Sequence, residues 1–238
     1  MEKLKIGFLS LTGCEGCEFV ILQLYEKLLK ISKRIEIVSF RLISSKKYQG
    51  QFDVFFIDGS ITTKDEEKFV KEMRNKSKIL VAIGSCATDG GVSIIRNIMN
   101  DPNSIKSVYK SEFLEEVNKE TKPLDSIVKI DYKLPGCPIN IEELEYFIKN
   151  IIVKKKPKER IINYTVCNDC ISKGIECVTK KGIFCAGPLT KGGCGAICPS
   201  FGVPCFGCRG PSINLKKNNL KELIKQRVEN GGIVFAQG

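Results

Sequence analysis

The sequence predicts an α/β domain built on a mainly parallel sheet, followed by a small irregular domain that depends on its cysteines. Three observations support this fold class. Short apolar segments alternate with amphipathic helical patterns up to residue 153, a basic segment follows, and eight of the twelve cysteines lie beyond it. The 238 residues, 42% of them hydrophobic, suffice for one domain with a core and a smaller appendage.

The predicted strands are short apolar segments, most of them apolar on both faces, as is typical of strands covered by helices on both sides. They cover residues 4–11, 35–43, 53–57, 78–83 and 127–132. The predicted helices cover residues 18–31, 64–75, part of 92–118, and 140–153. Five strands joined by helical crossovers predict a flavodoxin-like strand order.

Four cysteines follow predicted strands at the points where the strands end. Cys14 and Cys17 follow the first strand, Cys86 the fourth and Cys137 the fifth. Ligands of open parallel sheets bind outside the carboxyl ends of the strands, so we expect these four to converge. Residues 58–60 (Asp-Gly-Ser) end the third strand at the same edge, where the glycine would either admit a bulky cofactor or form a plain turn.

Cys17 is also expected to begin the helix that follows the first strand. The partial positive charge at a helix start favours a thiolate and an anionic ligand.

The other eight cysteines lie in a segment with few large apolar residues. The basic segment 154–160 (KKKPKER) precedes them, so we expect domains at residues 1–153 and 161–238. Metal must supply the folding energy of the second domain. Chain order divides its cysteines into Cys167, Cys170, Cys177 and Cys185, and then Cys194, Cys198, Cys205 and Cys208. An exchange of one ligand between these two sets is an open alternative. Beyond the last cysteine, the apolar residues of 215–228 recur at helical spacing, which predicts a helix there.

Twelve cysteines without a histidine restrict the metal chemistry to zinc or iron-sulfur clusters. The single cysteines Cys86 and Cys137 do not form a zinc knuckle, and Cys137 and Cys198 precede proline, as iron-sulfur ligands often do. We therefore favour clusters, and expect a small irregular C-terminal iron-sulfur domain. The sequence shows neither a secretory signal nor an apolar run long enough to span a membrane, so we expect a soluble cytoplasmic protein, where disulfides would not persist.

The charge balance offers little support for a nucleic-acid partner. Lysine and arginine (38) exceed aspartate and glutamate (27) by 11, but tryptophan and histidine are absent and base-stacking platforms are few. Part of the basic excess would balance anionic clusters.

These residues resemble a known family, the small electron-transferring subunits of cytoplasmic nickel-iron hydrogenases, which include sulfhydrogenase delta and methanogen hydrogenase gamma subunits. The resemblance spans nearly the whole chain. It lies in CEGCE at residues 14–18, GSCATDGG around Cys86, PGCP around Cys137, and FCAGPLTKGGC at residues 184–194.

The resemblance implies three [4Fe-4S] clusters. The proximal cluster would bind Cys14, Cys17, Cys86 and Cys137, the medial cluster Cys194, Cys198, Cys205 and Cys208, and the distal cluster Cys167, Cys170, Cys177 and Cys185. The chain differs from periplasmic relatives at two ligand positions. Cys167 stands where those relatives have a histidine ligand. Cys198 stands where they often have a proline and then hold a three-iron medial cluster. Gly13 stands where many respiratory relatives have an acidic residue. Glu15 or Glu18 is a candidate substitute for it, and a surface position or a supporting position beside the cluster is the alternative for both residues.

The resemblance also implies the partners. Hydrogen would be split in a separate large subunit that carries nickel and iron, and this chain would conduct electrons from the proximal to the medial and then the distal cluster. The acceptor would be a flavin- or iron-sulfur-containing subunit of the NAD(P), F420 or heterodisulfide-reductase type. A hydrogen-sensing regulatory subunit and a zinc-held scaffold stay open as alternatives, and an independent ferredoxin-like carrier is disfavoured because the cluster loops would leave an exposed face.

Overall fold

The computed structural model describes residues 3–24, 33–45, 48–99, 117–157 and 162–213. The chain divides into two compact units, unit 1 (residues 1–159) and unit 2 (residues 160–238). Within the described ranges, no helix has both the length and the apolar character that a membrane crossing requires.

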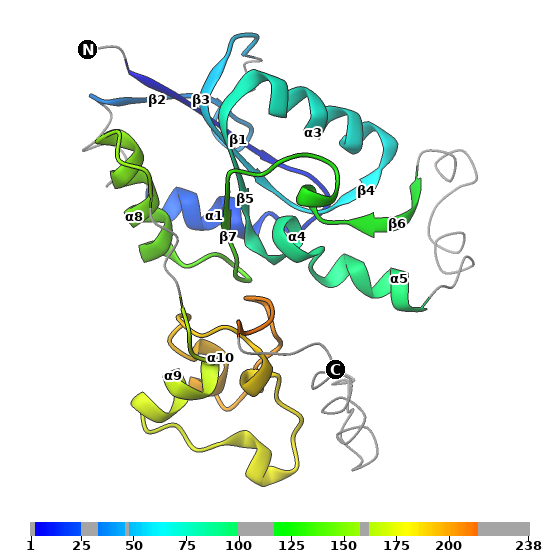
Figure 1. The fold of residues 1–238 in the computed structure, drawn as a ribbon, viewed down its shortest axis with the longest axis vertical. Helices are drawn as coiled ribbons and strands as arrows, with labels where there is room; N and C mark the ends of the chain where they lie inside the picture. Colours follow the sequence, from blue (N-terminus) through cyan, green and yellow to red (C-terminus); the bar gives the residue numbers. More distant parts are fainter. Residues whose placement is uncertain (1–2, 25–32, 46–47, 100–116, 158–161, 214–238) are drawn as a thin grey trace. The chain divides into compact units, whose positions relative to one another are not determined.

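Unit 1 contains a five-stranded sheet in which every neighbouring pair is parallel (Figure 1). Its strands are β1 (Leu4–Ser10), β2 (Ile35–Phe40), β3 (Phe52–Asp58), β5 (Ser77–Ile83) and β7 (Tyr132–Leu134). Their spatial order is β2-β1-β3-β5-β7. Numbered consecutively, this is the order 2-1-3-4-5 of flavodoxin-like sheets, so the predicted fold class is confirmed.

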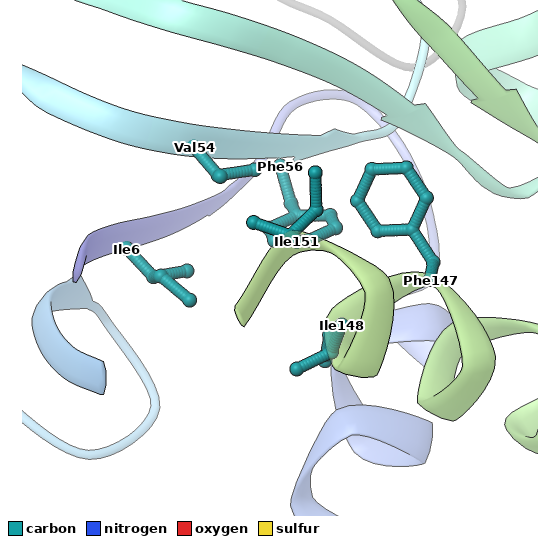
Figure 2. Close-up of a pocket in the computed structure, with 6 residues that line it drawn as sticks. All are labelled: Ile6, Val54, Phe56, Phe147, Ile148 and Ile151. Atoms are coloured by element: carbon teal, nitrogen blue, oxygen red, sulfur yellow. The ribbon is translucent and has the colours of Figure 1, made fainter. Parts of the chain in front are cut away.

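Other elements cover both faces of the sheet. Successive side chains of a strand point to opposite faces, so each strand contributes to the packing on both sides. In β3, Val54 and Phe56 pack on one face with helices α1 (Gly16–Gln23) and α8 (Ile141–Ile152). Phe55 and Ile57 pack on the other face with helix α3 (Lys64–Lys76). Figure 2 shows part of the first layer, where α8 and the sheet together line a small apolar pocket with Ile6, Val54, Phe56, Phe147, Ile148 and Ile151.

Helix α3 begins where the sequence predicts, and a capping box fixes its start. The Thr63 hydroxyl accepts a hydrogen bond from the Glu66 backbone at 3.2 Å, and the Glu66 carboxylate accepts one from the Thr63 backbone at 3.0 Å. These bonds satisfy amide groups that the first helical turn leaves unpaired.

The predicted fifth strand is misplaced. Residues 127–131 follow a short 3-10 helix, η2 (Leu124–Ser126), and cover the sheet as an irregular segment, whereas β7 begins at Tyr132. Asp131 holds this segment to β5, because its carboxylate accepts from Leu80 N at 2.8 Å and its own N–H donates to Leu80 O at 3.0 Å. An apolar run can cover a sheet without joining it, which periodicity alone does not reveal.

Other differences concern the short elements of unit 1. Helix α4 (Gly84–Asp89) was not predicted. The segment 92–118 begins with η1 (Val92–Ile94) and α5 (Ile95–Met99), and strand β6 (Val117–Lys122) pairs antiparallel with β4 (Ile61–Thr63) in a separate two-stranded sheet. Helix α1 is described up to Gln23, and the rest of its predicted length to residue 31 lies largely outside the described residues.

Unit 2 is irregular over its described part, as predicted. It contains α9 (Val166–Ser172), η3 (Val178–Lys181), η4 (Gly187–Leu189) and α10 (Ile197–Ser200). Its buried apolar cluster consists of Val166, Val178, Cys185, Ala196 and Cys205. A core this small, two of whose members are cysteines, is consistent with folding that depends on metal. The helix predicted at residues 215–228 lies outside the described residues.

Candidate metal centres formed by the cysteines

Four cysteines gather at the carboxyl ends of the parallel strands of unit 1. Cys14 precedes α1 and Cys17 lies in its first turn, Cys86 lies in α4 directly after β5, and Cys137 lies in the loop after β7. Burial raises the pKa of the Cys86 thiol to about 11, and Asp58, Cys137 and Cys14 raise it further by their charge. The charge of Cys86 in turn raises the pKa of the Cys17 thiol. The structure therefore brings all four thiols into one neighbourhood.

Two glycines leave room for the sulfur atoms in this neighbourhood. A Cβ atom at Gly84 would lie 2.4 Å from Cys17 Sγ, and one at Gly91 would lie 2.5 Å from Cys86 Sγ. Both have positive φ angles, +78° and +57°, which other residues adopt only at a cost. A side chain at Gly84 would intrude on the space beside Cys17 Sγ, and one at Gly91 on the space beside Cys86 Sγ. We call the region of these two glycines and two sulfur atoms the cradle.

The loop that carries Cys137 is tied to the helix that carries Cys86. Ser85 N donates to Gly136 O at 2.8 Å, and Gly136 pairs with Ile139 in an isolated bridge. The first bond connects the start of α4 to the loop after β7, and the bridge closes that loop. Together they restrict the separation of Cys86 and Cys137.

Cys17 begins a helix as predicted, but its electrostatic environment opposes a thiolate. Burial raises the pKa of the Cys17 thiol well above its usual range, and the nearby Asp58 carboxyl raises it further. Desolvation therefore outweighs the effect of the short helix α1. A metal that binds Cys17 has to displace the thiol proton, and the strength of a metal–thiolate bond makes this displacement favourable.

Buried carboxyl groups surround Cys17. Asp58 is 3% exposed, accepts a hydrogen bond from Gly59 N at 2.7 Å, and has a pKa raised by burial. Glu18 is 2% exposed, and its Oε1 has no hydrogen-bond partner among the described residues. Burial raises the pKa of Glu18 to about 7, with Glu15 and Asp58 adding to the effect. A surface role for Glu18, one of the readings of the sequence, is therefore wrong.

Gly59 has a different role from the cofactor contact considered for residues 58–60. A Cβ atom there would lie 2.7 Å from the backbone carbonyl carbon of Leu11, at a φ of +88°. The same turn is closed by a bond from Ser60 N to Thr12 O at 2.8 Å. Gly59 thus allows two backbone segments to pack, and the residue that faces the cysteines is its neighbour Asp58. The sequence signal that could have identified Asp58 as a residue of this site was an acidic residue at the carboxyl end of the third strand.

Seven cysteines of unit 2, from Cys167 to Cys205, influence one another by their charge. The pKa of the Cys170 thiol is raised to about 11. Burial is the largest cause, and the charges of four cysteines also raise it: Cys167, Cys185, Cys177 and Cys205. Burial raises the pKa of Cys198, and the charge of Cys194 adds to it. Cys170 therefore lies among the other members of its predicted set, and Cys198 lies beside Cys194.

Cys185 and Cys205, which belong to different predicted sets, are in direct contact. Cys205 N donates to Cys185 Sγ at 3.3 Å, and Ala186 N donates to Cys205 O at 2.9 Å. A Cβ atom at Gly187 would lie 3.4 Å from Cys185 Sγ and 3.7 Å from Cys205 Cβ. The two sets are thus adjacent at this point. Cys208 lies within a turn that is closed by a hydrogen bond from Gly210 N to Gly207 O.

The spacing of the thiols bears on what they can bind. None of the twelve cysteines, all of them described, is in a disulfide. Within the described part of the chain, no three His, Cys, Asp or Glu side chains are close enough together to hold a single metal ion. A cluster has a different requirement, because each of its thiolates binds a different iron atom and the ligands stand further apart.

Comparison with known proteins gives one family match, two relatives and one similar solved structure. Residues 14–151 match the family described as NADH ubiquinone oxidoreductase, 20 kDa subunit. The chain is 36% identical to sulfhydrogenase 2 subunit delta of Pyrococcus furiosus over 94% of this chain and 93% of that protein. It is 32% identical to one subunit of the vhu F420-non-reducing hydrogenase of Methanocaldococcus jannaschii, over 87% of this chain and 81% of that protein. Among solved structures, a chain of an NAD⁺-reducing [NiFe]-hydrogenase matches with a TM-score of 0.60 and 26% identity, over 66% of this chain and 95% of that one.

Proposed function

Because the chain belongs to the family of NADH ubiquinone oxidoreductase 20 kDa subunits and nickel-iron hydrogenase small subunits, we propose that it is the iron-sulfur electron-transfer subunit of a nickel-iron hydrogenase. It is a subunit of a hydrogenase, and hydrogenases are oxidoreductases. The observation that carries the proposal is that four cysteines from three strand ends lie near one another, with Gly84 leaving room beside Cys17 Sγ.

We propose that each set of four thiolates holds one [4Fe-4S] cluster. The sets are Cys14, Cys17, Cys86 and Cys137 (proximal), Cys194, Cys198, Cys205 and Cys208 (medial), and Cys167, Cys170, Cys177 and Cys185 (distal). Bound clusters supply one-electron oxidation and reduction at potentials set by their ligands, hydrogen bonds and exposure. In this proposal, unit 1 holds the proximal cluster and unit 2 holds the medial and distal clusters.

The residues of this chain contribute position and seclusion. Cys17, Cys185 and Cys205 are all less than 10% exposed, so water has little access to their sulfur atoms. The bond from Cys205 N to Cys185 Sγ supports close placement of the medial and distal sets. Electron transfer needs only such proximity and suitable potentials, and we assign no residue of this chain to nickel binding.

The partners follow from the same proposal. Relatives are subunits of hydrogenase complexes, so a large subunit that carries nickel and iron would split hydrogen beside this chain. The other partner would be a flavin- or iron-sulfur-containing acceptor subunit. We expect the complex in the cytoplasm, because thiolate ligands persist in a reducing compartment.

Elemental analysis of the chain, purified anaerobically with its associated subunits, tests the proposal. We expect about twelve iron atoms and a similar amount of sulfide per copy of this chain, since three cubane clusters each contain about four of both. Nickel should be present and should separate with a second polypeptide. Stoichiometric zinc without sulfide would refute the proposal in favour of the scaffold alternative.

A further inference from the structure

A buried arginine in unit 2 is not accounted for by the ligand sets. Arg209 is 4% exposed and directly follows Cys208. A guanidinium group remains protonated at every pH that proteins tolerate, and taking it out of water costs several kcal/mol unless anions or acceptors surround it. Its position therefore calls for an explanation in terms of its surroundings.

The side chain reaches the segment that leads into Cys194. Arg209 Nε donates to Gly192 O at 2.9 Å, and its Nη2 lies 3.5 Å from the place where Gly193 would carry a Cβ. Gly193 has a φ of +94° and directly precedes Cys194. Arg209 thus follows Cys208 in sequence and binds the peptide that directly precedes Cys194, so it joins the two segments that carry these two cysteines of the medial set.

The peptide that Arg209 binds is held on its other side by an acidic residue. Gly193 N donates to Asp169 Oδ2 at 2.8 Å, and Asp169 is 9% exposed. The carbonyl of Gly192 and the N–H of Gly193 belong to the same peptide group. Arg209 and Asp169 are therefore joined through one peptide, with Arg209 beside Cys208 and Asp169 next to Cys170 of the distal set.

We propose that Arg209 is a potential-setting residue, whose fixed positive charge raises the reduction potential of the medial cluster above the value that four thiolates alone would give. The inference rests on the proposed function, because it requires a cluster on Cys194, Cys198, Cys205 and Cys208. Reduction adds one negative charge to a site that is already anionic. A cation in a poorly hydrated environment stabilises the reduced form more than the oxidised form.

The same side chain could act only as a clamp on Gly192, so the variants separate charge from hydrogen bonding. Arg209→Gln keeps an N–H donor and removes the charge. Arg209→Lys keeps the charge and removes the planar donor group. Lys181→Gln is the matched control, because it removes an exposed charge of the same unit that water and salt screen.

The experiment is a redox titration of the anaerobically purified complex, followed by electron paramagnetic resonance. The medial component is the one whose signal is lost or altered in a Cys198→Ser variant. We expect Arg209→Gln to shift its midpoint to a more negative potential, and Arg209→Lys and Lys181→Gln to leave it close to the original value. An unchanged midpoint in Arg209→Gln, or an equal shift in Arg209→Lys, would overturn the inference.

Iron content covers the case in which a variant does not assemble fully. Loss of about four iron atoms in Arg209→Gln but not in Arg209→Lys supports a requirement for the charge, since one cubane contains that many. Equal loss in both variants overturns it. A parent complex without a reducible cluster in unit 2 would contradict the proposed function itself, which is a different outcome from intact clusters with an unmoved midpoint.

Discussion

At Gly84, a methyl group in place of hydrogen would stand 2.4 Å from the sulfur of Cys17. Neighbouring atoms have little freedom to move away, because Asp58 Oδ1 lies 3.2 Å from the same point. At the residue scale, the candidate centre thus depends on the absence of side-chain atoms as much as on the sulfur atoms themselves. Interiors are packed closely enough for a single methyl group to matter.

Gly84→Ala is expected to abolish cluster binding in unit 1. The positive φ alone costs about 1–2 kcal/mol for alanine, and the contact with Cys17 adds to this cost. We expect about four fewer iron atoms per chain, measured with the protein under anaerobic conditions.

Gly182→Ala is the matched control for this prediction. Gly182 has a φ of +75°, close to that of Gly84, but a Cβ atom there would meet no atom of the described residues within 4 Å. The control should pay the backbone cost and keep its iron. A Gly84→Ala protein with the full iron content would contradict the role assigned to the cradle.

At the scale of single elements, capping residues that are local in sequence determine where two of the helices begin. The capping box of α3 was readable from Thr63 and Glu66, and the N-cap Asn140 of α8 accepts from Glu142 N at 2.8 Å. In contrast, β7 and the β4–β6 pair depend on partners that are distant in sequence. Thr63 pairs with Val117 across 54 residues, and no local pattern marks that contact.

Thr63→Ala is expected to lower the free energy of unfolding of unit 1 by about 1 kcal/mol, because it removes the hydroxyl that accepts from Glu66 N. Thr63→Ser retains the hydroxyl and should lose much less. Denaturant unfolding of the purified chain, followed by far-UV circular dichroism, measures both. Equal destabilisation by serine and alanine would show that the cap is not the cause.

At the scale of the whole molecule, the two units differ in what stabilises them. Unit 1 buries two extended apolar clusters, one on each face of its sheet. The buried apolar cluster of unit 2 is small and includes Cys185 and Cys205. Burial of a large apolar side chain contributes about 1.5–3 kcal/mol, so the described core of unit 2 can contribute little without metal.

Removal of iron and sulfide with a chelator is therefore expected to unfold unit 2 and leave the sheet of unit 1 intact. Limited proteolysis, with the cleavage sites identified by mass spectrometry, should give rapid cuts within residues 162–213 and a surviving fragment that contains the five strands. The untreated complex is the control. Cleavage of both units at similar rates would contradict this division of stability.

Sequence alone determined the fold class, four of the five strands of the sheet, the placement of four cysteines after strand ends and the grouping of the other eight cysteines beyond the basic segment. These features depend on periodicity and chain order, which are local properties. Only the tertiary structure decided that Asp58 and Glu18 are buried beside Cys17, that Gly59 packs against Leu11, and that Arg209 reaches Gly192. Burial and charge proximity arise from segments distant in sequence, so the electrostatic environment of the cysteines becomes visible only when those segments are brought together.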